Sequence, residues 1–213
     1  MGCAQCSKKK ALQAQEPVQE FPVNVNVYDM VKEGGAVNKV LKAVTGGGIY
    51  HSGVEVGGWE FAYSQIINDD GKKVNTKETG VFRHKPRELP EDMSHVNFKT
   101  AINVGSVKTT RSDLSKRILK IMNDNPAAQY DVLTNNCNHF AARMCKDLGV
   151  DAPPDWINKL AEKSASVADA FGAVSDAITK VLAPPTQKRS LEDPSDASKT
   201  TQTQSADPNA TSL

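Results

Sequence analysis

The segment from Ile49 to Ile66, IYHSGVEVGGWEFAYSQI, constrains the fold more than any other part of the chain. It is rich in β-branched and aromatic residues, which favour strands over helices. Gly57-Gly58 lies in its middle, and a glycine pair between two such runs is typical of a hairpin turn. The segment therefore predicts two strands joined by a tight turn.

Three further segments of the first half also have the character of strands. From Val23 to Val27, valines alternate with Asn24 and Asn26, and this period of two indicates a half-buried strand. The segments GVFRH (80–84) and Asn97–Val104 predict two more strands. A short helix is predicted over Val37–Val44, in a looser stretch of the sequence.

The second half predicts helices. Thr110 with Asp113 three residues later resembles a capping box, and apolar residues follow at helical spacing from Leu114. A second helix is predicted from near Cys137 to Leu148, closed by Gly149; its buried stripe is Phe140, Met144 and Leu148.

A third helix is predicted after Pro153-Pro154, with Asp155 as its N-cap and an apolar face from Ile157 to Val181. Strands gathered early and helices gathered late favour an α+β fold, with a sheet packed against helices.

Composition divides the chain into three parts. Residues 1–21 form a short, polar and basic segment, which we expect to be flexible. Residues 22–182 carry the periodic apolar residues of a folded domain with a C-terminal helix. Residues 183–213 contain no aromatic group and too few apolar side chains to offset their ordering entropy, so a disordered tail is predicted.

Charge and hydropathy exclude several classes of protein. A formal net charge of +1 argues against nucleic acid as the main partner. The apolar runs are too short to span a bilayer, and no secretory signal follows Met1. A cytoplasmic protein is therefore expected, with its four cysteines reduced.

The segment LTNNCNHFAARMCKDLG carries the clearest chemical signal, because it places Cys137 where a helix begins. The first turn of a helix offers free backbone N–H groups and the positive end of the helix dipole, which lower the pKa of a thiol. The same N–H groups can stabilise an oxyanion. Cys137 is therefore a candidate nucleophile; the alternative is a buried cysteine near a helix end.

A nucleophilic cysteine needs a base, and the chain has four histidines. His139 lies about 200° around the helix from Cys137, so it is interpreted as a core or capping residue. His84 and His95 lie in polar, loop-like sequence. His51 is favoured, because a strand holds it rigidly and Gly53 leaves space beside it for a substrate or a neighbouring backbone.

A metal site or a disulfide is not expected in this segment. Cys137 and Cys145 are about 12 Å apart along a helix, too far for one tetrahedral zinc or for a disulfide. Cys145 is interpreted as a small buried apolar residue. No metal and no cofactor are predicted.

The sequence resembles the PPPDE family, the DeSI-type deSUMOylating isopeptidases. The resemblance covers about Val23 to Ala161 and is carried by VNVYDM, GGIYHSGVEV, TGVF, NNCNHFAARM and PPDWINKLA, in that order. It implies a permuted papain-like thiol peptidase fold, in which His51 and Cys137 form the catalytic dyad.

The resemblance implies acyl transfer. His51 takes the proton of Cys137, the thiolate attacks an isopeptide carbonyl, and water releases the acyl-enzyme. The Cys137 N–H and an asparagine side chain are the expected oxyanion donors. No residue that orients His51 is evident, because Glu55 on the same strand face lies about 13 Å away.

Three functions are compatible with these residues. The first is a hydrolase, a thiol isopeptidase that removes ubiquitin or SUMO from proteins. The second is an S-acyl thioesterase, or depalmitoylase, that uses the same dyad. The third is a non-catalytic scaffold tethered to a membrane.

The amino terminus predicts lipid attachment to the cytoplasmic face of a membrane. Gly2 suits N-myristoylation, and Cys3 and Cys6 suit palmitoylation. One acyl chain anchors a protein only marginally, so a second signal is needed. Lys8, Lys9 and Lys10 supply it by attracting anionic headgroups.

Overall fold

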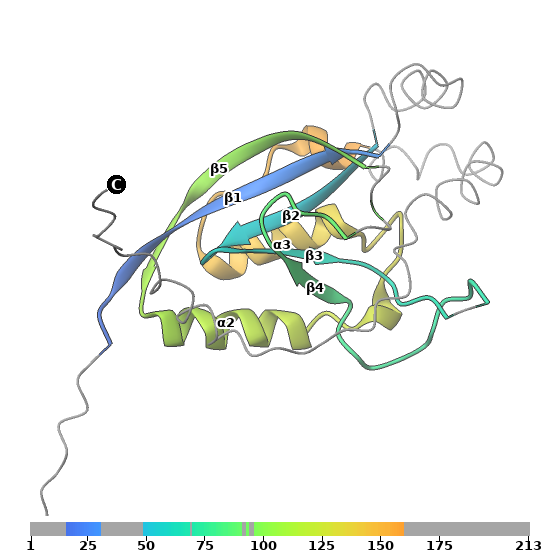
Figure 1. The fold of residues 1–213 in the computed structure, drawn as a ribbon, viewed down its shortest axis with the longest axis horizontal. Coiled ribbons are helices and arrows are strands. Elements are labelled where there is room, and N and C mark those ends of the chain that lie inside the picture. Colours follow the sequence, from blue (N-terminus) through green and yellow to red (C-terminus); the bar gives the residue numbers. More distant parts are fainter. Residues whose placement is uncertain (1–15, 31–48, 69, 91–92, 94–95, 160–213) are drawn as a thin grey trace, which may run out of the picture.

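The computed structural model describes residues 16–30, 49–68, 70–90, 93 and 96–159 (Figure 1). Its centre is a five-stranded antiparallel sheet in the order β4-β3-β2-β1-β5. The strands are β1 (Gln19–Asp29), β2 (Tyr50–Val56), β3 (Trp59–Tyr63), β4 (Val81–His84) and β5 (Asn97–Thr109). The predicted α+β class and antiparallel sheet are confirmed.

The hairpin predicted at Gly57-Gly58 joins β2 to β3. Both glycines have positive φ, 62° and 87°, as a two-residue turn of the primed type requires. Val56 pairs with Trp59 directly beside the turn. The register of the two strands is therefore fixed by the turn.

The two longest strands exceed their predictions. β1 begins at Gln19 rather than Val23, and β5 runs on from Val104 to Thr109. The two strands pair along their whole length, with register shifts at Val23/Asn24 and Val27/Tyr28. These extra residues are in strands because β1 and β5 pair with each other over a long sequence distance, and no local alternation of apolar side chains predicts that pairing.

Two α-helices follow the sheet as predicted. In α2 (Arg111–Asn123), the Thr110 hydroxyl accepts the backbone N–H of Asp113. The helix α3 (Cys137–Leu148) ends at Gly149, whose φ of 76° is the left-handed C-cap geometry. The predicted apolar stripe of α3 is buried; it consists of Phe140, Met144 and Leu148.

Two short 3₁₀ helices complete the described fold, η2 (Ala127–Gln129) and η3 (Asp155–Asn158). The predicted N-cap at Asp155 is wrong: Pro154 is the cap, and Asp155 is the first residue of η3. The remainder of the predicted third helix, from Leu160, lies outside the described residues, as does the predicted helix Val37–Val44.

The sheet buries both of its faces. One face packs against α3 through an apolar cluster that includes Val54, Phe61, Phe140 and Met144. The opposite face holds a smaller cluster: Tyr28, Met30, Ile49, Ala62, Phe82, Met93 and Val96. Side chains of one strand therefore alternate between two separate cores.

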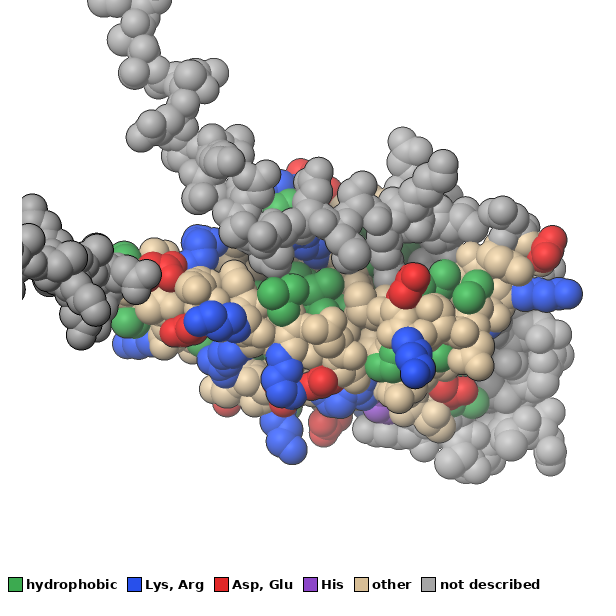
Figure 2. All heavy atoms as spheres, turned by 90° about the horizontal axis from the view of Figure 1, so that it is seen from below, with side chains coloured by type: hydrophobic (Ala, Val, Ile, Leu, Met, Phe, Trp, Pro, Cys, Tyr) green, Lys and Arg blue, Asp and Glu red, His purple; other side chains and the backbone are tan. Residues whose placement is uncertain are grey.

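The outer surface of α2 is charged. Figure 2 views the molecule from this side, where Lys and Arg side chains are interspersed with Asp and Glu side chains. Lys116 and Asp113 form one of the ion pairs on it, at 2.9 Å. This surface is a solvated helix face.

Candidate active site

Cys137 is the first residue of α3 and is 3% exposed. The helix start is held by Asn136, whose Oδ1 accepts the backbone N–H groups of Asn138 and His139. His139 completes a capping box with Asn136, and its Nε2 contacts the Asn158 side-chain amide at 3.1 Å, so its predicted role as a capping residue is confirmed.

Asn138 fastens this helix start to β2. Its Oδ1 accepts the Ser52 hydroxyl at 2.7 Å, and its Nδ2 donates to the backbone carbonyl of Tyr50 at 3.1 Å. The second hydrogen of Nδ2 goes to the carbonyl of Ile157 at 3.2 Å. The two residues that flank His51 are thus tied to the residue that follows Cys137.

The thiol of Cys137 lies at the same edge of β2. β3 pairs with β2 only at Val54, Glu55 and Val56, which leaves the earlier half of this edge to α3. The backbone N–H of Ser52 forms a hydrogen bond that favours the Cys137 thiolate. That nitrogen is two covalent bonds from the Cα of His51, so the sulfur lies beside the His51–Ser52 peptide.

Burial governs the protonation of Cys137. It raises the pKa of the thiol to about 11, against the hydrogen bonds from the backbone N–H groups of Ser52, Asn138 and Cys137 itself, which lower it. The prediction of a lowered thiol pKa is therefore wrong in direction. The expected N–H groups of the helix start are present, but the loss of hydration outweighs them.

His51 is likewise kept neutral. It is 4% exposed, and burial lowers its pKa to about 3, with a smaller contribution from His84. Within the described part of the chain, its Nε2 has no hydrogen-bond partner. A neutral imidazole with an unpaired ring nitrogen retains the capacity to accept a proton.

The space beside Gly53 is already filled. A Cβ at this position would lie 2.3 Å from Oε1 of Glu60, so the glycine makes room for a side chain of β3. The prediction that this space serves a substrate or a backbone is wrong. Glu60 is itself fully buried, which the sequence pattern gave no reason to expect.

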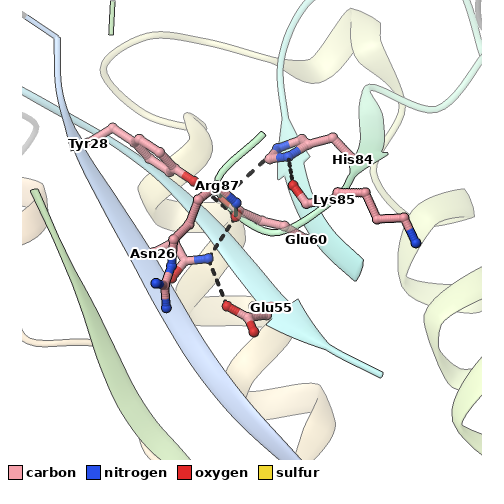
Figure 3. A network of polar contacts seen from close by, with 7 residues as sticks. All are labelled: Asn26, Tyr28, Glu55, Glu60, His84, Lys85 and Arg87. Carbon is pink, nitrogen blue, oxygen red and sulfur yellow. Dashed lines mark hydrogen bonds and ion pairs between the residues drawn. The ribbon is translucent and has the colours of Figure 1, made fainter. Parts of the chain in front are cut away.

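His84 lies within the strand predicted over 80–84 and not in the loop that its sequence surroundings had suggested. It is the last residue of β4 and is nearly buried, and its Nδ1 contacts the backbone carbonyl of Lys85. Its Nε2 lies 3.9 Å from Oε1 of Glu60 (Figure 3). The loop-like residues that follow it, Lys85 and Pro86, lie just beyond the strand end. His95 lies outside the described residues.

Cys145 is a fully buried core residue of α3, as predicted, and burial raises its pKa to about 11. Glu55, which the sequence placed on the same strand face as His51, accepts the Asn26 amide at 3.0 Å. In the described ranges, no three His, Cys, Asp or Glu residues are grouped to hold a metal ion. No helix there combines the length and apolarity that crossing a bilayer requires.

Sequence reasoning missed Ser52, Asn138, Tyr28 and Glu60. Asn138 could have been predicted, because the side chain directly after a cysteine in the first turn of a helix can contact the element on which that helix packs. Tyr28 and Glu60 become significant only through cross-strand pairing, which links Tyr28 to His51 and β3 to β2, and Ser52 only through its contact with Asn138 of α3. No local signal marks them.

Comparison with known proteins places this chain in a family. The model of the PPPDE putative peptidase domain matches residues 21–174. The chain is 34% identical over 145 residues to "Desumoylating isopeptidase 1 homolog" of Caenorhabditis elegans, covering 68% of this chain and 40% of that protein.

Two further relatives are DeSI-like proteins. One from Arabidopsis thaliana is 28% identical, over 76% of this chain and 64% of its own length. The protein "DeSI-like protein sdu1" of Schizosaccharomyces pombe is 27% identical, over 83% of this chain and 79% of its own length. The chain thus spans less than two thirds of the first two relatives.

The resemblance seen in the sequence motifs is therefore confirmed. The five-stranded antiparallel sheet with its helices is consistent with a papain-like fold of this kind. Because the family model covers most of the chain, the protein belongs to the PPPDE putative peptidase family.

Proposed function

We propose that this protein is a thiol isopeptidase that removes SUMO or ubiquitin from proteins, with Cys137 as nucleophile and His51 as base. The observation that carries the proposal is that Asn138, the residue after Cys137, binds both neighbours of His51, Ser52 at 2.7 Å and Tyr50 at 3.1 Å, which places the Cys137 sulfur beside the backbone N–H of Ser52. Membership of a peptidase family supports the same class of reaction. The name of the Caenorhabditis elegans relative favours SUMO conjugates as substrates.

The reaction starts from a neutral pair, because burial raises the pKa of Cys137 to about 11 and lowers that of His51 to about 3. His51 accepts the thiol proton as the sulfur attacks the isopeptide carbonyl carbon. The S–C bond forms, the C–N bond breaks, and His51 returns the proton to the leaving lysine amine. Water, deprotonated by His51, then hydrolyses the thioester and regenerates the thiol.

Main-chain groups are the better oxyanion donors at this site. Both hydrogens of the Asn138 amide are engaged, by Tyr50 and by Ile157. The Asn136 amide donates to Val132 and contacts Asn158. The backbone N–H of Cys137, at the helix start, therefore takes the role that an oxyanion hole requires.

The decisive experiment compares two cysteines of one helix. Cys137→Ala should abolish cleavage of an isopeptide-linked SUMO substrate while the melting temperature stays within a few degrees. Cys145→Ala is the matched control, since it removes a buried thiol eight residues further along α3 and should keep most of the activity.

Full activity of Cys137→Ala would refute the dyad. Probes with SUMO, ubiquitin and fatty-acyl electrophiles then define the substrate. Labelling of Cys137 by the fatty-acyl probe alone would replace the isopeptidase with an S-acyl thioesterase. The absence of labelling by all three, in a folded protein, would favour a scaffold.

Attachment to the cytoplasmic face of a membrane is part of the proposal. It is supported by the composition of the N-terminal segment, where Gly2, Cys3 and Cys6 can carry acyl chains and Lys8–Lys10 can meet anionic lipids. These residues lie outside the described ranges. In cells, Gly2→Ala should move the protein from the membrane pellet to the supernatant; unchanged pelleting would contradict acylation.

A further inference from the structure

A fully buried carboxyl group, that of Glu60, lies on the face of the sheet that carries His51. It accepts the Asn26 amide at 2.7 Å and the backbone N–H of Arg87 at 3.0 Å (Figure 3). The Tyr28 hydroxyl reaches both carboxyl oxygens, at 2.8 and 2.9 Å. Burying such a group is costly unless its partners are all in place, so packing alone does not account for it.

Glu60 reaches these partners by crossing a neighbouring strand. It belongs to β3, whereas Asn26 and Tyr28 belong to β1, on the far side of β2. Its side chain passes over Gly53, the residue of β2 that has no side chain to block it. Gly53 lies two residues from His51 on the same face of β2, so the crossing point is next to the proposed base.

Tyr28 connects this carboxyl group to His51. It is the direct cross-strand partner of His51, and their ring centroids are 6.0 Å apart. On its other side the Tyr28 ring meets Phe98 edge to face at 5.7 Å. Burial raises the pKa of Tyr28 far above its usual range, so the hydroxyl keeps the proton that it donates to Glu60.

The turn after β4 adapts to the same carboxyl group. Arg87 has a φ of 65°, in the left-handed region that non-glycine residues rarely adopt. This conformation directs its N–H to Oε2 of Glu60. Strain held at such a position requires compensation from the surrounding contacts, and here the compensating contact is Glu60.

We propose that Tyr28, anchored by Glu60, is a positioning residue that holds the His51 imidazole in the orientation from which it deprotonates Cys137. The inference rests on the proposed function, because it assumes that His51 is the base. It supplies the orienting contact that Glu55, bonded to Asn26 instead, does not provide.

A double-mutant cycle on thiol reactivity tests this without any protein substrate. The full-length protein is treated at neutral pH with iodoacetamide, and the Cys137 peptide is followed by mass spectrometry. Tyr28→Phe, which keeps the ring, should slow alkylation of Cys137 about tenfold; Glu60→Gln should act in the same direction. In a His51→Ala background, Tyr28→Phe should change the rate less than twofold.

The control is Tyr63→Phe. Tyr63 is also a fully buried tyrosine, and its hydroxyl donates to the carbonyl of Pro126 on the opposite face of the sheet. This variant loses a comparable hydrogen bond and should leave the alkylation rate within twofold of the wild type.

Two outcomes overturn the inference. Equal slowing by Tyr28→Phe with and without His51 means a purely structural role, and no slowing in either background means no role. Failure of the proposed function is separate: the wild-type protein would then cleave no SUMO or ubiquitin conjugate, whatever the alkylation cycle gives.

Discussion

The face of the sheet toward α3 is filled with apolar side chains, whereas the opposite face buries an asparagine, a tyrosine, a glutamate and a histidine beside its apolar residues. Apolar contacts are non-directional and tolerate exchange for a side chain of similar volume. The contacts of Glu60 depend on particular donors at particular distances. The α3 face therefore accounts for stability, and the polar face has the character of a functional site.

The largest expected effect is on the apolar face. Phe140 is fully buried in α3 and packs on Tyr63 of the sheet. Phe140→Ala should lower the free energy of unfolding by about 3–5 kcal/mol, through lost burial and the cavity left behind. Urea unfolding followed by circular dichroism measures it; a loss below about 1 kcal/mol would mean that this face does not carry the stability.

A smaller effect is expected where the polar face is crowded. Gly53→Ala places a methyl group 2.3 Å from Oε1 of Glu60, so the carboxyl group must move. We expect a loss of about 1–3 kcal/mol from overpacking, and slower alkylation of Cys137 as well. The same urea experiment and the mass-spectrometric assay check both; an unchanged alkylation rate would separate Gly53 from the site.

Acid should expose the cost of keeping His51 neutral. Its pKa is about 3 when folded, against about 6.5 ordinarily, so below pH 6.5 the unfolded chain binds a proton that the folded chain does not. The stability that His51 contributes is complete above pH 6.5 and is lost as the pH falls toward 3, at about 1.4 kcal/mol per pH unit.

His51→Gln should remove that part of the pH dependence. Urea unfolding between pH 7 and pH 4 measures the slope for both proteins. His139, whose pKa burial also lowers, is common to both and leaves a residual slope. Identical slopes would show that His51 is hydrated and chargeable in the folded protein.

The smallest effect is expected at a glycine that belongs to neither face. Gly149 caps α3 with a φ of 76°, and a Cβ there would meet no atom within 4 Å. Gly149→Ala should therefore cost about 1 kcal/mol, from backbone strain alone, with normal alkylation of Cys137. A larger loss of reactivity here than in Gly53→Ala would reverse the contrast between the two regions.

Local sequence patterns were sufficient to predict the helices, strands and turns, but not the contacts between them. The Gly57-Gly58 turn, the Thr110 cap and the Gly149 cap were readable because each depends on neighbouring residues. The contact of Ser52 with Asn138 joins residues 86 apart in the sequence. Nothing within a few residues of either one specifies it.

The places of the two candidate residues in the fold were predictable, and their electrostatics were not. The sequence placed Cys137 at a helix start and His51 in a strand, and both are found there. The predicted direction of the Cys137 pKa was wrong because the sequence shows the helix start but not the burial of the thiol, which has the larger effect. Gly53 was assigned to a substrate because the side chain that fills its space comes from another strand.

The amide of Asn138 has a consequence for how the molecule is made. Through one side chain it binds Tyr50 in the second strand and Ile157 near the end of the described chain. A nascent chain on the ribosome lacks the second of these acceptors until residue 157 has been synthesised and released from the exit tunnel. The sulfur therefore gains its final setting late, when the sheet around it can already be complete.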